Sequence, residues 1–234
     1  MVTVDITLPV FNEEKVLVQS VGTLRDFLQS GFPHQWRLVI ADNASVDSTL
    51  AVAKELALLY PDVTYIHLDE KGRGRALKKA WLESKADIVS YMDIDLSTNL
   101  SHFPPLIDAL TKGYDLAIGS RLMGASRIKR SLKREVLSRG YNLIVKAMFR
   151  TRFSDAQCGF KALTRKAVQA LVPLVEDNKW FFDSELLILA EKKGYRIAEI
   201  PVEWVEDLDT RVKIIRTSLD DLKGLLRVRT RPIP

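Results

Sequence analysis

The sequence predicts an α/β fold with a mostly parallel central sheet that is covered by helices on both faces. Short apolar segments alternate with longer amphipathic segments through the first half of the chain. Strands that are apolar throughout and separated by helices are typical of parallel sheets buried on both sides. A length of 234 residues is enough for one domain with a sizeable core. The expected strands are Val4–Leu8, Arg37–Ala41, Val63–Leu68, Ile88–Met92 and Leu116–Gly119, and the expected helices between them are Glu13–Gln29, Ser48–Leu59, Arg75–Ser84 and His102–Thr111.

The second half of the chain is less regular, and its elements are assigned from apolar periodicity. No internal repeat or low-complexity linker interrupts it, so we expect a single domain over residues 1–234. The expected elements are a basic amphipathic helix over Lys133–Arg150, a hairpin-like segment over Cys158–Leu163, helices over Arg165–Leu171 and Ser184–Lys193, a strand over Tyr195–Pro201 and a helix over Lys213–Val228. The last helix carries an apolar stripe of Ile214, Ile215, Leu219, Leu222, Leu225 and Leu226.

A pair of acidic residues directly follows the strand predicted over Ile88–Met92. Parallel sheets bind ligands at the carboxyl ends of their strands, so Asp93 and Asp95 lie where chemistry is expected. Two carboxylates held this close repel each other unless a cation lies between them. Oxygen ligands with open coordination positions suit Mg²⁺ or Mn²⁺ that also binds substrate phosphates. An isolated Asp-x-Asp is common in solvated loops, but its position at a strand end favours a divalent metal site.

A basic glycine loop follows the strand predicted over Val63–Leu68. Gly72 and Gly74 alternate with Lys71, Arg73 and Arg75 immediately before a predicted helix. A loop of this kind can bind phosphate through its backbone amides and its cationic side chains. A dinucleotide fingerprint is disfavoured because the third glycine is absent. An ordinary turn before an exposed helix remains the alternative.

Positive charge is concentrated in one segment of the chain. The protein carries a net charge of +5, whereas residues 127–152 contain nine Lys and Arg residues and Glu135 as the single acid, a local charge of +8. This excess indicates an anionic partner such as a phosphate, a lipid headgroup or a nucleic acid, with a solvated basic face as the alternative. The single cysteine, Cys158, excludes an intramolecular disulfide and agrees with a reducing compartment. The N-terminus lacks a signal-peptide pattern, and no run of about 18 apolar residues predicts a membrane span.

Taken in order, the strand-end loops resemble those of glycosyltransferase family 2, the inverting enzymes with one nucleotide-binding α/β domain of the GT-A type. Further motifs are similar to the polyprenyl-phosphate sugar synthases, a branch that includes dolichyl-phosphate mannose and glucose synthases. The resemblance extends to about Val228. It rests on Leu8–Glu13, Asp42 with Ser45–Asp47, Lys71–Ala76, Asp93–Asp95, Gly119–Arg121, Ser138–Asn142, Asp155–Lys161, Phe182–Leu186 and Glu199–Val202.

This resemblance implies a donor site in about residues 1–120. Asp42 would accept a hydrogen bond from the nucleobase, and Asp93 and Asp95 would hold the ribose side and the metal that bridges the diphosphate. Asn43 and Ala44 stand where the family usually has a second Asp and a Gly, which leaves uracil and guanine open. The other residues implied for the nucleotide sugar are Pro9, Phe11, Glu13, Lys71, Gly72, Arg73 and Gly74.

The resemblance also implies an acceptor site in about residues 121–234. A phosphate monoester is already anionic near neutral pH, so it can attack a sugar without a protein base. The reaction needs positive charge to hold two phosphates close together, and arginine binds phosphate oxygens bidentately. Arg121 and Arg139 are therefore expected to act in catalysis together with Asp93 and Asp95. The implied acceptor-binding residues are Arg121, Arg134, Arg139, Gln157, Arg211 and Lys213.

Three functions remain open on the sequence. The first is metal-dependent sugar transfer to a polyprenyl or dolichyl phosphate, with UDP-glucose favoured as donor and GDP-mannose second. The second is a family 2 enzyme that acts on a saccharide hydroxyl, and the third is a non-enzymatic module that binds nucleic acid or an anionic membrane. For the first, we expect a cytoplasmic protein bound peripherally to a membrane surface through the basic helix and the C-terminal helix. A membrane-spanning partner, or a spanning region outside this sequence, would strengthen the attachment, and no nucleic-acid partner is expected.

Overall fold

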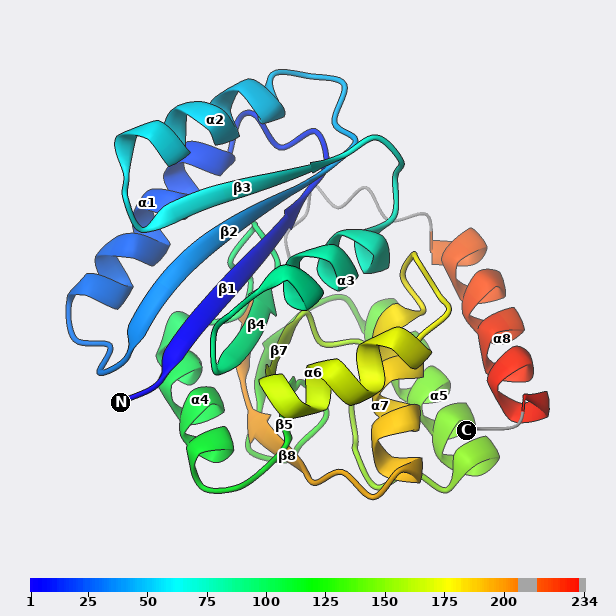
Figure 1. The fold of residues 1–234 in the computed structure, drawn as a ribbon. Helices are drawn as coiled ribbons and strands as arrows, with labels where there is room; N and C mark the ends of the chain where they lie inside the picture. The colour runs from blue at the N-terminus through cyan, green and yellow to red at the C-terminus, as the bar shows by residue number, and fades with distance from the viewer. Residues whose placement is uncertain (206–213, 232–234) are drawn as a thin grey trace.

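The computed structural model describes residues 1–205 and 214–231, and it describes side chains throughout except at 214–218. Its main feature is a seven-stranded sheet in the order β3-β2-β1-β4-β7-β5-β8 (Figure 1). Every neighbouring pair in it is parallel except the two pairs that involve β7. The predicted mostly parallel sheet is therefore confirmed. The strands are β1 (Thr3–Val10), β2 (Gln35–Asn43), β3 (Val63–Leu68), β4 (Ile88–Met92), β5 (Leu116–Ser120), β7 (Phe160–Thr164) and β8 (Ile197–Pro201).

The prediction of a hairpin over Cys158–Leu163 is wrong. The segment forms the single strand β7, which runs antiparallel between β4 and β5. Its alternating side chains pack on both faces, with Phe160 and Ala162 in one core and Leu163 in the other. Both strand partners come from much earlier in the chain. Local sequence therefore indicates an extended segment here but does not indicate its partners.

Two hydrophobic cores lie on opposite faces of the sheet because strand side chains alternate between faces. Leu38 and Ile40 of β2 belong to one core, and Val39 between them belongs to the other. Helices α1 (Leu17–Gln29), α2 (Thr49–Leu59) and α4 (Phe103–Thr111) contribute to the first core. Helices α3 (Arg73–Glu83), α6 (Arg165–Leu171) and α7 (Phe182–Lys192) contribute to the second. This three-layer arrangement leaves the carboxyl ends of the strands as the open edge of the sheet.

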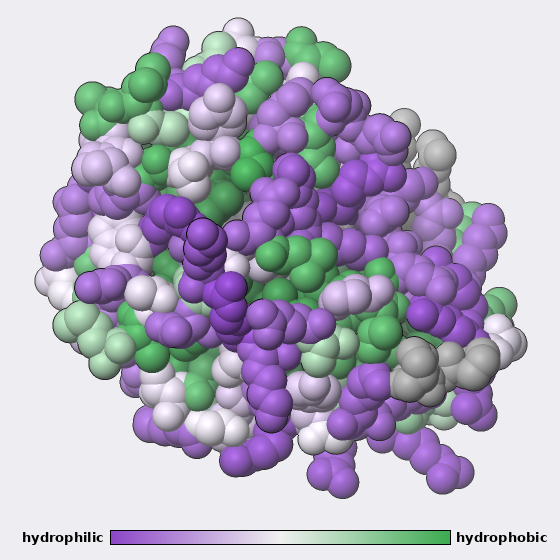
Figure 2. All heavy atoms as spheres, viewed as in Figure 1, coloured by the Kyte–Doolittle hydropathy of each residue, from purple (hydrophilic) through white to green (hydrophobic). Residues whose placement is uncertain are grey.

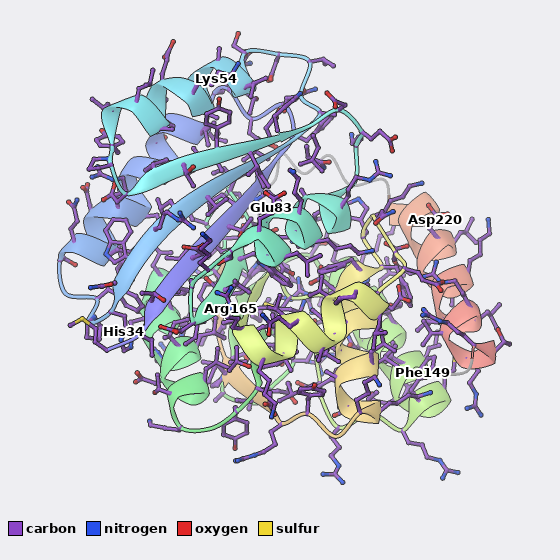
Figure 3. All side chains as sticks on the ribbon, viewed as in Figure 1. His34, Lys54, Glu83, Phe149, Arg165 and Asp220 are labelled. Carbon is purple, nitrogen blue, oxygen red and sulfur yellow. The ribbon has the colours of Figure 1, made fainter. Side chains whose placement is uncertain are left out.

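Two further helices, α5 (Leu132–Phe149) and α8 (Ile214–Thr230), pack beside α7 and contact each other (Figure 1). Each buries one side only. In α8, Asp220 lies on the outer side of the helix (Figure 3), whereas the neighbouring Asp221 is buried. Helix α2 shows the same division, with Lys54 on the outer side and Ala53 buried. Among residues 1–205 and 214–231, no helix is both long enough and apolar enough to cross a membrane.

A small parallel sheet of β6 (Arg127–Lys129) and β9 (Glu203–Val205) lies beyond the main sheet and was not predicted. These three-residue strands are too short and too polar to produce a periodic signal. Two single-turn 3₁₀ helices, η1 (Leu100–His102) and η2 (Val172–Leu174), complete the described elements. The face seen in Figure 2 is largely hydrophilic, with apolar side chains in smaller groups between the charged ones.

Candidate active site

The loops after β1 and β2 are tied together at the carboxyl edge of the sheet. The amide of Asn12 donates to Ser45 Oγ at 2.9 Å, and the amide of Val46 donates to Asn12 Oδ1 at 2.9 Å. The amide of Glu13 donates to Thr49 Oγ1 at 2.8 Å. Asn12 has a left-handed φ of 58°, a conformation that asparagine tolerates better than most residues. These bonds give the two loops a fixed relative geometry, and α1 consequently starts at Leu17, later than predicted.

Asp42, the residue before the last in β2, lies next to His67 of β3, its partner in the strand register. His67 Nδ1 lies 2.6 Å from Asp42 Oδ2, and the Asp42 side chain is fully buried. In the loops that follow β3 and β1, Lys71 Nζ lies 3.2 Å from the centre of the Phe11 ring. The structure thus gathers the residues predicted for the nucleoside near the ends of β1, β2 and β3. Its hydrogen bond with Asp42 gives His67 a structural role at this edge of the sheet.

The prediction that backbone amides of the glycine loop bind phosphate is wrong for three of them. The amide of Gly72 donates to Asn43 Oδ1 at 2.5 Å. The amides of Gly74 and Arg75 donate to backbone carbonyls of residues 179 and 178, at 3.2 and 3.1 Å. A Cβ at Gly72 would overlap the backbone of residue 178, and one at Gly74 would overlap Phe182. The glycines therefore permit close packing of a distant loop, which no local pattern reveals.

Asp93 and Asp95 flank the buried Ile94 directly after β4. Asp93 Oδ1 accepts a hydrogen bond from Arg73 Nη2 at 2.5 Å, and Asp95 Oδ1 accepts one from the amide of Ser97 at 3.0 Å. A Cβ at Gly159 would overlap the Asp93 carboxylate, so glycine is required there. In the described part of the chain, no group of three or more His, Cys, Asp or Glu side chains is arranged to hold a metal ion. Two carboxylates fit a Mg²⁺ or Mn²⁺ ion whose other ligands are phosphate and water oxygens.

Arg73 connects Asp93 to a buried ionic cluster that the sequence analysis missed. Arg73 Nη1 lies 2.6 Å from Asp183 Oδ2, and Lys161 Nζ lies 2.7 Å from Asp183 Oδ1. Tyr91 also donates its hydroxyl to Asp183. Burial alone would raise the pKa of Asp183, but Lys161 and Arg73 hold it below its ordinary value. One signal was available: Lys161 and Asp183 are charged residues inside segments that are otherwise largely apolar.

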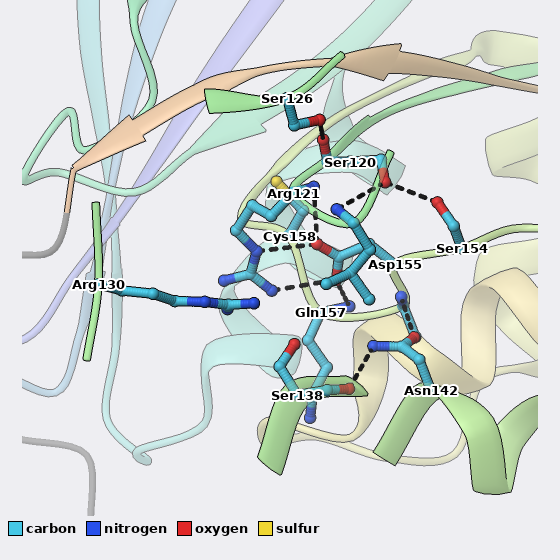
Figure 4. A network of polar contacts seen from close by, with 12 residues as sticks. Ser120, Arg121, Ser126, Arg130, Ser138, Asn142, Ser154, Asp155, Gln157 and Cys158 are labelled. Atoms are coloured by element: carbon cyan, nitrogen blue, oxygen red, sulfur yellow. Dashed lines mark hydrogen bonds and ion pairs between the residues drawn. The ribbon is translucent and has the colours of Figure 1, made fainter. Parts of the chain in front are cut away.

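Arg121, a predicted acceptor residue, is held by a buried carboxylate (Figure 4). Its Nε and Nη2 donate to Asp155 Oδ2 and Oδ1 at 2.8 and 3.0 Å, and its amide donates to Oδ2 at 3.1 Å. Burial would raise the pKa of Asp155, but the paired guanidinium and these hydrogen bonds lower it to about 2. The salt bridge does not use Nη1 of Arg121. The arginine is therefore fixed in orientation and keeps one terminal nitrogen outside the pair.

Arg130 and Ser138 join Arg121 in the same cluster and were not singled out from sequence. Figure 4 shows the Arg130 guanidinium pointing toward Arg121 and Gln157, with Ser138 beside them. The Arg130 side chain is 4% exposed; its Nε donates to Glu135 at 2.5 Å, while Nη2 lies against the same carboxylate without hydrogen-bond geometry. Ser138 Oγ is buried without a hydrogen-bond partner among the described residues. The cluster therefore combines two arginines with polar atoms that are not fully used.

The structure brings together only part of the arginine set predicted to bind the acceptor, which was Arg121, Arg134 and Arg139. Arg139 is 60% exposed and pairs with Glu135 one turn earlier on α5, at 2.5 Å, so it adjoins the cluster through that carboxylate. Arg134 is half-buried in the first turn of α5. Arg211 and Lys213 lie outside the described residues. Arg130 lies before α5 and turns inward, whereas Arg139 lies on an exposed face of the helix.

Gln157 links the cluster to α8. Its Nε2 donates to Asp221 Oδ2 at 2.8 Å, and Asp221 Oδ1 is buried without a hydrogen-bond partner in the described part of the chain. Burial raises the pKa of Asp221 to about 7. The amide of Gln157 also donates to Asp155 at 3.1 Å. Gln157 therefore connects the Arg121–Asp155 pair to the C-terminal helix.

The sequence of residues 5–172 matches the family model described as glycosyl transferase family 2. The chain belongs to glycosyltransferase family 2. This membership confirms the resemblance drawn from the strand-end loops, and the family 2 domain places all of those loops at one edge of its sheet.

Curated relatives agree with this family. Glycosyltransferase AglD of Haloferax volcanii is 37% identical over 229 residues, which are 97% of this chain and 37% of AglD. A dolichyl-phosphate beta-glucosyltransferase of Saccharomyces cerevisiae is 30% identical over 244 residues, 96% of this chain and 73% of that enzyme. Dolichyl-phosphate beta-glucosyltransferase ALG5C of Trichomonas vaginalis is 29% identical, over 88% of this chain and 65% of the enzyme. The chain thus spans about a third of the length of AglD, about two thirds of the Trichomonas enzyme and somewhat more of the yeast enzyme.

Among solved structures, glucosyl-3-phosphoglycerate synthase from Mycobacterium tuberculosis in complex with UDP has a TM-score of 0.75. The superposition covers 99% of this chain and 81% of that one at 20% sequence identity. This similarity shows that the family 2 domain has the predicted GT-A type of fold.

Proposed function

We propose that this chain catalyses inverting transfer of a sugar from a nucleotide sugar to the phosphate of a polyprenyl phosphate such as dolichyl phosphate. The observation that carries the proposal is the junction of two sites by one short segment. Gly159 lies against Asp93 of the acidic site, and Asp155, four residues earlier, holds Arg121 of the basic cluster. The acidic pair proposed for the metal and the arginine cluster proposed for the acceptor phosphate are thereby adjacent. The yeast and Trichomonas relatives, named as dolichyl-phosphate beta-glucosyltransferases, support this assignment.

The donor site is assigned to the carboxyl ends of β1 to β4. Asp93 and Asp95 would hold Mg²⁺ or Mn²⁺, which when bound supplies positive charge to the leaving diphosphate. Arg73 and Lys71 add cationic side chains near it, and Gly72 and Gly74 shape the loop that carries them. Pro9, Phe11, Glu13 and Asp42 are assigned to the nucleoside. UDP-glucose is the favoured donor and GDP-mannose the second, and the structural neighbour crystallised with Mn²⁺, UDP-glucose and phosphoglyceric acid supports this order.

The acceptor site is assigned to the cluster of Arg121, Arg130 and Ser138. The arginines would hold the acceptor phosphate, with Ser138 donating its hydroxyl and Gln157, Arg134 and Arg139 at the margin. A phosphate oxygen would then form a bond to the anomeric carbon from the face opposite the diphosphate. The bond from that carbon to the diphosphate breaks, and the diphosphate leaves with the electron pair. Arg211 and Lys213 stay predicted acceptor contacts.

The carboxylates around the acceptor cluster argue against a saccharide hydroxyl as acceptor. A hydroxyl must lose a proton, so that reaction needs an accessible base. Asp155 is paired with Arg121, and Glu135 is paired with Arg130 and Arg139. Asp221 is 3% exposed and bonded to Gln157. A phosphate acceptor needs no base and accounts for the arginines. A non-enzymatic binding module would leave the acidic site and the glycine loop without a role.

We further place the chain peripherally on the cytoplasmic face of a membrane, docked on anionic lipid. Apolar side chains of α5 and α8 face solvent, including Leu132 at 84%, Val136 and Leu143 at 69% and Leu226 at 61% exposure. Leu132, Val136 and Leu143 recur at helical spacing on one side of α5, and Lys133 and Arg139 lie beside them in the sequence of the helix. An apolar stripe bordered by cations complements an anionic bilayer, and α5 also carries Ser138 of the acceptor cluster. A spanning partner or a longer chain would add to this attachment.

The experiment that tests the proposal follows radiolabelled sugar into an organic phase. UDP-glucose and GDP-mannose are each incubated with Mn²⁺ and with either dolichyl phosphate or a saccharide acceptor. With dolichyl phosphate, we expect label from UDP-glucose to become extractable only when metal is present. Arg130→Gln should raise the KM for dolichyl phosphate while UDP affinity stays unchanged. Arg127→Gln is the matched control, because Arg127 is 84% exposed in the same segment. Label found only in a water-soluble saccharide product would favour the second function, and no transfer to either acceptor would favour the third.

A further inference from the structure

A buried ion pair lies next to the proposed donor site. Lys161 of β7 is fully buried, and the side chain of Asp183 is 3% exposed. Lys161 Nζ lies 2.7 Å from Asp183 Oδ1, 2.8 Å from the carbonyl oxygen of Cys158 and 3.1 Å from that of Ala156. Burying such a pair is costly, and an apolar pair of similar volume often gives equal or greater stability. Its presence therefore calls for a role other than holding the fold together.

The ion pair acts on the donor site through Arg73. This side chain is 10% exposed. Its Nη1 donates a hydrogen bond to Asp183 at 2.6 Å, and its Nη2 donates one to Asp93 at 2.5 Å. Its guanidinium carbon lies 4.8 Å from the ring centre of Tyr91 and 5.0 Å from that of Trp180. Arg73 is thus shared between two carboxylates, one buried and one, Asp93, that is 44% exposed.

Sharing limits how completely Arg73 neutralises Asp93. A guanidinium left with a single carboxylate turns its planar fork toward it and forms two parallel hydrogen bonds. Asp183 prevents this arrangement because it occupies Nη1. Lys161 sets the strength of this hold, because it compensates part of the Asp183 charge. Two cations and two carboxylates are balanced in this cluster, and the position of Arg73 depends on both neighbours.

We propose that Asp183, with Lys161 as its counter-ion, is a positioning residue that holds Arg73 back from Asp93 and so keeps Asp93 available to a divalent cation. The inference rests on the metal role assigned to Asp93 and Asp95 under the proposed function. Neither Asp183 nor Lys161 touches the donor; both act through Arg73.

Removing Lys161 alone and removing both charges of the ion pair should have opposite effects on metal affinity. Lys161→Met leaves the full charge of Asp183 on Arg73, draws Arg73 away from Asp93, and should keep or tighten metal binding. The pair Lys161→Met with Asp183→Asn leaves Arg73 to Asp93 alone and should weaken metal affinity by about tenfold or more, as loss of an outer-shell partner commonly does. Adding Arg73→Gln to that pair should bring most of the lost affinity back, because the competing cation is gone.

Mn²⁺ titration of the nucleotide-free protein, followed by water-proton relaxation, measures these affinities without reference to activity. Circular dichroism and thermal melting establish that each variant is folded; the double variant removes one charge of each sign, and Lys161→Met retains two donors to Asp183. Arg75→Gln is the matched control, since Arg75 shares the loop and helix start but pairs with Glu70 at 2.5 Å. It should leave the Mn²⁺ affinity unchanged.

The outcomes separate this inference from the proposed function. If the wild type binds no Mn²⁺, or Asp95→Asn binds it equally well, the metal assignment fails and the inference fails with it. If Asp95→Asn loses Mn²⁺ but the double variant binds as the wild type does, only the inference is overturned. A weaker Lys161→Met variant, or a triple variant that stays weak, would also overturn it, because the pair would then act through shape alone.

Discussion

Two buried carboxyl groups in this protein have very different pKa values because their hydrogen-bond and charge partners differ. Asp155 is fully buried yet its pKa falls to about 2, since Arg121 and two backbone amides stabilise the charged form. Asp221 is buried to a similar extent with one amide donor, and desolvation raises its pKa to about 7. Burial penalises the charged form of both, and the partner decides whether the penalty is offset.

Asp221→Asn is predicted to change how stability depends on pH. The folded pKa of about 7 lies above the unfolded value of about 4, so this carboxyl contributes most to stability below pH 4 and loses that contribution as pH rises from about 4 to 7. The asparagine side chain keeps an acceptor for Gln157 and cannot ionise. We expect similar unfolding free energies for the two proteins at pH 4 and a variant that is more stable by about 3 kcal/mol at pH 8. Urea unfolding at both pH values measures this, and parallel pH profiles would contradict it.

Helices in this fold differ in how closely they approach their neighbours. Gly22 in α1 has open space where a Cβ would lie. Gly224 in α8 lies against the Phe181 ring, which a Cβ would overlap. Helix α8 can therefore reach the second core only because residue 224 lacks a side chain. This close approach is also what brings Asp221 to Gln157.

The same substitution at these two glycines is predicted to have opposite effects. Gly22→Ala should stabilise the protein by about 0.5–1 kcal/mol, because alanine loses less backbone entropy in a helix. Gly224→Ala should destabilise it by about 1–3 kcal/mol, since Phe181 and α8 must move apart. Urea denaturation measures both, with each variant serving as the control for the other. A stabilised Gly224→Ala protein would show that α8 does not pack as described.

At the scale of the whole molecule, apolar residues divide into two sheet-facing cores and an outer set on α5 and α8. The apolar residues of the basic helix are Val136, Leu137, Leu143, Ile144, Val145, Met148 and Phe149. The structure separates them: Val145 and Phe149 are buried, and the first four are exposed. In α8, Leu225 is buried, whereas Leu219, Leu222 and Leu226 are exposed. Neither α5 nor α8 therefore packs its apolar residues entirely on the core.

Vesicle co-sedimentation tests whether this outer set binds a membrane. We expect binding that requires anionic lipid and weakens as salt rises, because each basic residue near the surface contributes about 1 kcal/mol of screened attraction. Val136→Glu with Leu143→Glu should reduce it strongly. Leu58→Glu is the matched control, since Leu58 is 89% exposed on α2, which belongs to the other face of the sheet. Equal loss in all variants, or binding that ignores lipid charge, would contradict docking through α5.

Local sequence by itself determined most elements and the acidic site. The strands Val63–Leu68 and Ile88–Met92 and the helix Arg165–Leu171 have the predicted bounds, because their apolar runs and turn residues lie within a few positions of one another. The position of Asp93 and Asp95 after a strand followed from the same pattern. The order of the motifs along the chain was sufficient to identify the family. All of these properties depend on residues that are close in sequence.

Tertiary structure alone decided which charges meet. Arg73 and Asp183 are 110 residues apart, and Lys161 and Tyr91 are 70 apart. The place of β7 in the sheet, the occupied amides of the glycine loop and the inward turn of Arg130 likewise depend on packing between distant segments. Hydrogen bonds and ion pairs act over a few ångströms, so their partners are set by where the chain folds back. A basic segment in the sequence therefore indicates an anion, but the fold selects which arginines can bind it.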